Sequence, residues 1–382
     1  MIRQNYLPFG KPNFSEDEIS AVTQVLRSGW VGMGPETLAF EKELGKHLGA
    51  PHIVTVNSCT AALFLSLLVN NINPGDEVIC PSLTWCSTAN VALYLGAKPV
   101  FCDIDRDTLC LTPETVLEKL TPKTKAVMVV HFGGLAVEVG KIRAVLPDKV
   151  IVVEDAAHAL GAKFKNGQFV GTSTNLTCFS FYANKNISTG DGGAVVCFDP
   201  NIRERIDSLR QHGLPVNAWK RFSHPKTVII SPELSELGYK MNYTDLQASI
   251  GRVQLKRQKS FNLTRLSIAN YYHEKLSSLG AKIEFQSNIL HPYHARHLFT
   301  ILLNDGVFSR DKILWELRKR NVGATIHYSP LHSMPLYEQQ HQVLPNTEKI
   351  YKQIITLPIG ASMSLEDAEY VVQQFEEVLQ KY

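Results

Sequence analysis

The stretch TCFSFYANKNISTGDGG, residues 177–193, opens like a buried strand and then breaks into small and polar residues. Its first part is mostly apolar, aromatic or β-branched, as in a core strand, and glycines close it. Lys185 lies just past the break. Lysine is rarely buried, but a simple exposed loop lysine would explain neither the small neighbours nor the glycines. Lys185 is therefore a candidate for chemistry at the end of a core strand.

Strand-like and helix-like segments alternate along the chain before residue 244. At the N-terminus, Ser15 and Glu18 form a capping-box pattern, and Gly29 closes the helix that follows. We predict strands at IVTV (53–56), EVICP (77–81), PVFCDI (99–104), KAVMVVHF (125–132) and KVIVVED (149–155). This alternation favours an α/β fold with a large doubly wound sheet, mostly parallel, that has helices on both faces.

The pattern changes after residue 244. One long helical pattern covers residues 245–280. Beyond it we predict strands at 297–303 and 324–329 and helices at 309–320 and 364–380. The sequence therefore predicts an N-terminal segment and large domain in residues 1–260 and a smaller α+β domain in residues 261–382.

Composition excludes several classes of protein. The chain has 382 residues, a net charge of +3 and no block of like charges, so we expect no nucleic-acid partner. The first residues lack a signal-peptide pattern, and no apolar run approaches the roughly 18–20 residues of a membrane helix. The seven cysteines are scattered without a C-x-x-C pair and read as reduced thiols rather than as a metal site. We therefore expect a cytoplasmic protein with no membrane partner and no metal.

Polar residues follow the predicted strand at 53–56. Asn57, Ser58, Cys59 and Thr60 form a turn that opens onto an apolar helix. Free backbone N–H groups and the helix dipole make such a helix start a seat for a phosphate. An ordinary N-cap has the same composition and is, for this turn alone, the more common explanation.

A carboxylate follows the strand that ends near residue 155. Asp155 is expensive at the end of a buried strand unless it is paired, and His158 lies one turn further on. The carboxylate could bind a metal, orient a histidine or hold a protonated heterocycle, and it could also be a helix N-cap. Trp85, just after the strand at 77–81, adds a flat face that could stack on a ring or belong to the core.

Together these features indicate pyridoxal 5'-phosphate as the cofactor. In doubly wound sheets, ligands bind beyond the carboxyl ends of the strands, where all of these residues are expected. A lysine can form the Schiff base, a carboxylate can keep the pyridine nitrogen protonated, and a helix N-terminus can hold the phosphate. The combination is more specific than any one of the three.

The chain resembles the DegT/DnrJ/StrS family of sugar aminotransferases over nearly its whole length. The lysine block SFYANKNISTGDGGAVV (180–196) is similar to the family's lysine motif. Further similar blocks are VNSCTAALFLSL (56–67), EDAAHALGA (154–162), LGYKMNYTDLQ (237–247) and IHYSPLHSMPLY (326–337). The resemblance implies the aspartate-aminotransferase-like fold (fold type I) and a pyridoxal-phosphate-dependent transaminase.

The resemblance also implies roles for particular residues. Lys185 matches the lysine that carries the cofactor, and Asp155 matches the partner of the pyridine nitrogen. The other implied cofactor contacts are Trp85 (stacking), His158 (beside the ring hydroxyl), Thr60 and Ser180 (phosphate), and the backbone N–H groups of Cys59 to Ala61. Asn242 matches the block that reaches the phosphate from a neighbouring subunit, which implies a homodimer with shared active sites. Cys59 departs from the glycine that many members have.

The implied substrates are an amino-acid donor, usually glutamate, and a keto sugar attached to a nucleotide. The segment SGWVGMGP (28–35) and the lysine block are most like those of members that act on C4-keto sugars. Segment 210–221, with Arg210, His212, Lys220 and Arg221, could hold a diphosphate or be a solvated basic loop. Further candidate substrate residues are Trp30, His327 and Tyr328.

Two other functions are compatible with such a fold. A sugar dehydratase of this family carries histidine at the lysine position, which Lys185 argues against. A non-catalytic regulator could keep the fold, but Lys185 and Asp155 are costly to retain in an apolar pocket without a cofactor.

Overall fold

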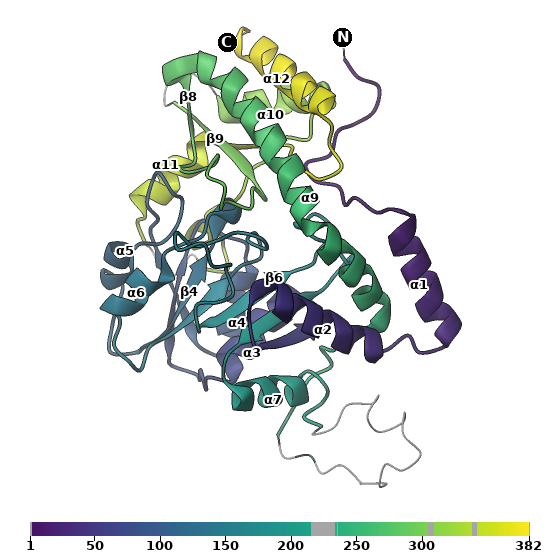
Figure 1. Ribbon diagram of the computed structural model, residues 1–382. Coiled ribbons are helices and arrows are strands. Elements are labelled where there is room, and N and C mark those ends of the chain that lie inside the picture. The colour runs from purple at the N-terminus through teal and green to yellow at the C-terminus, as the bar shows by residue number, and fades with distance from the viewer. Residues whose placement is uncertain (1, 215–233, 235, 305–308, 338–341, 382) are drawn as a thin grey trace.

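The large sheet predicted from the sequence is present in the computed structural model, which describes residues 2–214, 234, 236–304, 309–337 and 342–381 (Figure 1). Its strand order is β1-β7-β6-β5-β4-β2-β3. The strands are β1 (His52–Val56), β2 (Glu77–Pro81), β3 (Lys98–Cys102), β4 (Thr124–Val130), β5 (Ile151–Asp155), β6 (Leu176–Ser180) and β7 (Gly193–Cys197). All neighbours pair in parallel except β7, which is antiparallel to β1 and β6.

Helices cover both faces of this sheet. One face packs against α3 (Cys59–Leu68), α4 (Ser87–Tyr94) and α7 (Pro200–Leu209). The other packs against α2 (Pro35–Leu48), α5 (Pro113–Leu117), α6 (Val139–Val145) and α9 (Asp245–Leu276). Adjacent strand residues therefore enter opposite cores, as Ile53 and Val54 do. Short 3₁₀ turns cover Phe132–Gly134, Ser277–Lys282 and Leu331–Ser333.

The parallel pairing fixes where chemistry can occur. Because β1, β2, β4, β5 and β6 run in one direction, the residues that follow them meet at one edge of the sheet. Strand β7 runs the other way, so its first residue, Gly193, starts at that same edge, opposite Val56 and Ser180. The carboxyl ends of these parallel strands and the start of β7 therefore lie at the same edge of the sheet.

The first helix follows its sequence signals closely. Helix α1 (Glu16–Ser28) begins after Ser15, whose side chain forms the predicted capping box with Glu18, and ends at Gly29 in the left-handed region. The side chain of Glu18 also accepts hydrogen bonds from Gln254 and Arg257 of α9. Glu18, which completes the capping box, therefore also joins α1 to α9.

Helix α9 links the large sheet to a second, smaller sheet (Figure 1). The smaller sheet has strands β8 (Ile283–Phe285), β9 (Phe299–Leu303) and β10 (Ile354–Leu357), with α10 (Arg310–Lys319), α11 (Pro345–Gln353) and α12 (Leu365–Leu379) around it. Leu7 packs into this C-terminal core, although it comes from the other end of the chain. The predicted boundary at residue 260 falls inside α9, so the division of the chain there stays a prediction.

One predicted strand is wrong. Residues 324–329 form no strand, and Thr325 makes only an isolated bridge to Thr356. The Tyr328 side chain instead reaches His158 at the edge of the large sheet, while His327 keeps a side-chain contact with Thr356 of β10. In the part of the chain that the structure describes, no helix is both long and apolar enough to cross a membrane.

Asp245 joins the start of α9 to the start of α2. Its carboxylate is buried and accepts hydrogen bonds from the backbone N–H groups of Gly34, Glu36 and Thr37 and from the Thr37 hydroxyl. These N–H groups lie at the start of α2, where backbone N–H groups have no carbonyl acceptor within the helix.

We predict that Asp245→Ala destabilises the protein by about 2–4 kcal/mol, because it leaves several buried donors without an acceptor. The midpoint of urea denaturation measures this change. Asp17→Ala, at an exposed position in the first turn of α1, is the matched control and should change stability by less than about 0.5 kcal/mol. Equal midpoints for the two variants would show that Asp245 is not needed as a cap.

Candidate active site

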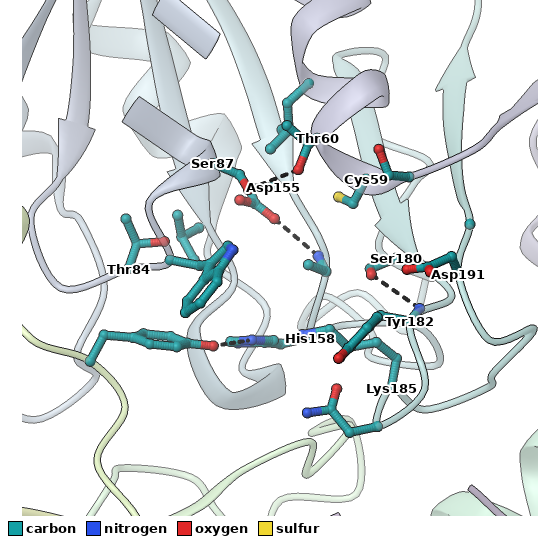
Figure 2. Close-up of a pocket in the computed structure, with 18 of the residues that line it drawn as sticks. Cys59, Thr60, Thr84, Ser87, Asp155, His158, Ser180, Tyr182, Lys185 and Asp191 are labelled. Carbon is teal, nitrogen blue, oxygen red and sulfur yellow. Dashed lines mark hydrogen bonds between the residues drawn. The ribbon is translucent and has the colours of Figure 1, made fainter. Parts of the chain in front are cut away.

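A cavity of about 420 Å³ opens at the edge where the strands of the large sheet end (Figure 2). Its walls come from the residues that follow β1, β2, β5 and β6 and from the segment around residue 327. Several predicted site residues line it: Thr60, Trp85, Asp155, His158, Ser180, Lys185, His327 and Tyr328. The topology therefore brings together side chains from the N-terminal and C-terminal thirds of the chain.

The start of α3 forms an anion seat in this wall. Ser58 caps the helix by accepting a hydrogen bond from the N–H of Ala61 at 3.1 Å, so that donor is already used. The N–H groups of Cys59 and Thr60 lie in the first turn and have no partner within the helix, and the contact predicted for Ala61 stays a prediction. The Thr60 hydroxyl lies 2.8 Å from that of Ser87, and Ser180 lines the same cavity (Figure 2).

Gly193 allows this seat to lie against the sheet. A Cβ atom at this position would lie 2.6 Å from the Cys59 nitrogen and 2.6 Å from the Ser58 carbonyl carbon, which are backbone atoms that cannot swing away. Any other residue would push the turn off β7. The close approach of β7 to the Ser58–Cys59 backbone explains why the sequence has glycine at position 193.

Asp155 ends β5 with a buried carboxylate. One oxygen accepts a hydrogen bond from the Thr88 hydroxyl at 2.8 Å and the other accepts one from the Ala157 N–H at 3.1 Å. Burial raises the pKa of Asp155, and these two neutral donors only partly oppose it. Among the described residues no ion pair is formed by this carboxylate. A cationic group in the cavity would therefore be stabilised beside it.

His158 is held in one tautomer. The Gly133 N–H donates to Nδ1 at 3.3 Å, so Nε2 carries the proton and donates to the Tyr328 hydroxyl oxygen at 2.9 Å. Burial and the nearby charge of Lys185 hold the pKa of His158 well below its usual value. His158 thus presents a neutral N–H donor at the cavity wall. The sequence offered no signal for its contact with Tyr328.

Lys185 lies in the turn after β6, as predicted. Its backbone N–H donates to the Tyr182 carbonyl at 3.0 Å, and Gly192 has a φ of 144°, which favours glycine. Burial lowers the pKa of Lys185 to about 8; Cys59 and Asp155 act against this shift, and the charge of Arg265 adds to it. Near neutral pH a substantial fraction of this amine is therefore uncharged, as a nucleophile requires.

Some predicted residues do not line this cavity. Arg210 is fully buried, with an ion pair to Glu41 at 2.7 Å and another to Asp207, so the expectation that it lies at the cavity mouth is wrong. Its neighbours explain the placement, since two carboxylates compensate its charge inside the core. Trp30 donates from Nε1 to the Met33 carbonyl at 3.0 Å.

The remaining predictions lie elsewhere in the chain. Asn242 pairs through its backbone with Val56 and does not line the cavity of its own chain. The His212 N–H donates to the Tyr239 carbonyl at 2.8 Å. Lys220 and Arg221 lie outside the described residues. Trp30 and Asn242 therefore stay predictions for a contact with a second subunit or a substrate.

The cavity also has residues that sequence reasoning missed. Thr84, Tyr182, Asn184 and Asp191 line it. Thr84, Tyr182 and Asn184 follow strand ends and Asp191 just precedes the start of β7, which are the signals that could have identified them. His297 lies behind Lys185, and nothing in its local sequence distinguishes it from the start of an ordinary strand. Among the described residues, no three His, Cys, Asp or Glu side chains gather in a way that could hold a metal ion.

Comparison with known proteins gives one consistent result. Residues 12–376 match the DegT/DnrJ/EryC1/StrS aminotransferase family. The chain is 38% identical to the spore coat polysaccharide biosynthesis protein SpsC of Bacillus subtilis, covering 99% of this chain and 98% of that one.

Solved structures agree over the same length. The putative sugar aminotransferase Spr1654 of Streptococcus pneumoniae, in its PMP form, has a TM-score of 0.90 and 30% identity, covering 98% of this chain and 99% of that one. The aminotransferase PseC of Helicobacter pylori, involved in the biosynthesis of pseudoaminic acid, has a TM-score of 0.90 and 27% identity, covering 99% and 100%. The predicted fold type and the resemblance are thus confirmed.

We predict that the reactivity of Lys185 rises with pH through a midpoint near 8, because only the uncharged amine reacts and burial lowers its pKa to about 8. Competitive acetylation followed by peptide mass spectrometry measures the midpoint for each lysine. Asp155→Asn should shift the midpoint down, since Asp155 favours the charged amine. A midpoint near the ordinary lysine value of about 10.4 would contradict the burial of this amine.

Proposed function

This chain belongs to the DegT/DnrJ/EryC1/StrS aminotransferase family, and from that membership we propose that it moves an amino group from glutamate to a keto sugar attached to a nucleotide. It is an aminotransferase that depends on pyridoxal phosphate. The observation that carries the proposal is Lys185, a lysine with a lowered pKa that lines the same cavity as the unpaired carboxylate of Asp155.

The residues of the cavity fit pyridoxal phosphate group by group. The seat at Cys59 and Thr60, with Ser180, suits the phosphate. Asp155 is a buried carboxylate without a cationic partner among the described residues, as a protonated ring nitrogen requires. His158, whose Nε2–H donates to the Tyr328 hydroxyl, is the proposed neighbour of the ring hydroxyl. When bound, this cofactor supplies an electron sink that stabilises negative charge on the carbon next to the transferred nitrogen.

Lys185 has two tasks in this proposal. Its uncharged amine attaches the cofactor and leaves it when the amino donor arrives. The freed Nζ atom would then take a proton from the substrate carbon as a base and deliver it to the cofactor carbon as an acid. A lysine with a pKa of about 8 suits both tasks, because at neutral pH neither protonation state is rare.

The sugar substrate is proposed from the relatives. SpsC is named for polysaccharide biosynthesis and PseC for the biosynthesis of pseudoaminic acid. The segment at 28–35 further favours a C4-keto sugar by its resemblance to such members. His327 and Tyr328, which line the cavity, are the proposed contacts to the sugar.

We predict that the protein, loaded with cofactor and supplied with glutamate, aminates at least one of a panel of nucleotide-linked keto sugars. Release of 2-oxoglutarate follows the reaction, and Lys185→Ala, which should fold normally, is the control without activity. Efficient turnover of simple 2-keto acids, with no nucleotide sugar aminated, would make this an ordinary amino-acid transaminase.

Asp155→Asn should lower turnover by well over tenfold while the cofactor stays bound, because the variant lacks the charge that keeps the ring nitrogen protonated. A tenfold loss corresponds to about 1.4 kcal/mol, and a preorganised charge in a dry site contributes several times that. Steady-state kinetics measures the loss, and cofactor absorbance checks occupancy. If turnover falls less than tenfold at full occupancy, another residue holds the ring nitrogen.

We also propose a homodimer in which Asn242 contacts the phosphate of the partner's cofactor. Mixing Lys185→Ala with Asn242→Ala, each inactive alone, should then restore activity, because one site of each mixed dimer carries neither lesion. Native mass spectrometry confirms subunit exchange. Exchange without recovered activity would place both residues in the site of one chain.

A further inference from the structure

His297 stands directly behind the lysine of the site. It precedes β9 and is 1% exposed, and its Nε2 atom lies 3.4 Å from Nζ of Lys185. None of the roles assigned above uses it.

Packing fixes the ring of His297 in place. It stacks on His158 with ring centres 4.4 Å apart and planes at 30°. Phe9 approaches its edge at 6.5 Å and 90°. The neighbouring Arg296 carbonyl accepts a hydrogen bond from the buried guanidinium of Arg265 at 3.3 Å. The imidazole therefore has little freedom to turn away from Lys185.

The direction of the hydrogen bond follows from the chemistry of the two groups. A charged lysine has three donors and no acceptor, so Nζ donates and Nε2 of His297 accepts. Burial and the charge of Lys185 hold the pKa of His297 well below its usual value, so the imidazole stays neutral and keeps this acceptor. When the amine is uncharged, the same N–H to Nε2 contact leaves its lone pair free to react.

The other imidazoles near Lys185 are engaged elsewhere. His158 uses Nδ1 with Gly133 and Nε2 with Tyr328. His327 uses Nδ1 with the Thr356 hydroxyl at 3.0 Å. Nδ1 of His297 is buried and has no partner among the described residues. The ring thus makes its one polar contact with Lys185.

We propose that His297 is a positioning residue that holds Nζ of Lys185 through Nε2 whenever the lysine is not attached to the cofactor. The inference rests on the proposed attachment of the cofactor to Lys185. Because an amine on a four-carbon stem has many rotamers, fixing it beside the cavity raises the fraction of molecules that can react. A low pKa makes His297 a weak base, so it acts by position and not by removing the proton.

Three variants separate the acceptor from the ring. His297→Gln places an amide oxygen near the position of Nε2, whereas His297→Asn reaches only the position of Nδ1. His297→Phe keeps the stacked ring and removes the nitrogen. The measurement is the rate at which apoprotein attaches pyridoxal phosphate covalently, followed by visible absorbance and by borohydride trapping with peptide mapping. Pyridoxamine phosphate, which cannot attach, reports whether each variant keeps a folded binding site.

We expect His297→Asn and His297→Phe to attach the cofactor at least tenfold more slowly than the parent protein, and His297→Gln to stay within about threefold. Affinity for pyridoxamine phosphate should change by less than about threefold in all three. Attachment at the parent rate in the Phe and Asn variants would overturn the proposal. An equal loss of attachment rate in all three variants would also overturn it, because the ring would then be needed for packing and not for holding Nζ of Lys185. Trapping of the parent protein on a lysine other than Lys185 would overturn the proposed function itself, and this role with it.

Discussion

The partial burial of Lys185 is the constraint on which the site depends. Lysine in water is charged and unreactive at neutral pH, and removing it from water disfavours the charge. Lys185 lies just after the end of β6, where burial disfavours its charged form and lowers its pKa to about 8. Asp155 and Arg265 act on it in opposite directions. An uncharged fraction of the amine is therefore present near neutral pH, so Lys185 can both attack and carry a proton.

The parallel arrangement of strands in the large sheet makes this placement possible. Parallel strands deliver Thr60, Asp155 and Lys185 to one edge from separate parts of the chain. The C-terminal part of the chain adds Tyr328 and His297, whose side chains contact His158 and Lys185. Neutral imidazoles surround the amine because charged ones would repel it.

Much of this was predictable from local patterns. Strand ends followed by polar residues predicted that Lys185, Asp155 and the turn at Ser58–Thr60 lie together, and capping signals predicted α1. The failures have a common cause, which is that long-range contacts decide the outcome. Arg210 reads as a loop cation until Glu41, 169 residues away, pairs with it. Residues 324–329 have a strand composition, but only Thr325 pairs with β10, and His327 and Tyr328 line the cavity. No local pattern distinguishes His297, because its partner is 112 residues away.

The most direct test of this account is a crystal structure of the protein loaded with pyridoxal phosphate. The account predicts electron density continuous from Nζ of Lys185 to the cofactor, with the Asp155 carboxylate within hydrogen-bond distance of the ring nitrogen and the phosphate at the start of α3. Attachment to a different lysine, or a ring nitrogen that faces away from Asp155, would contradict it.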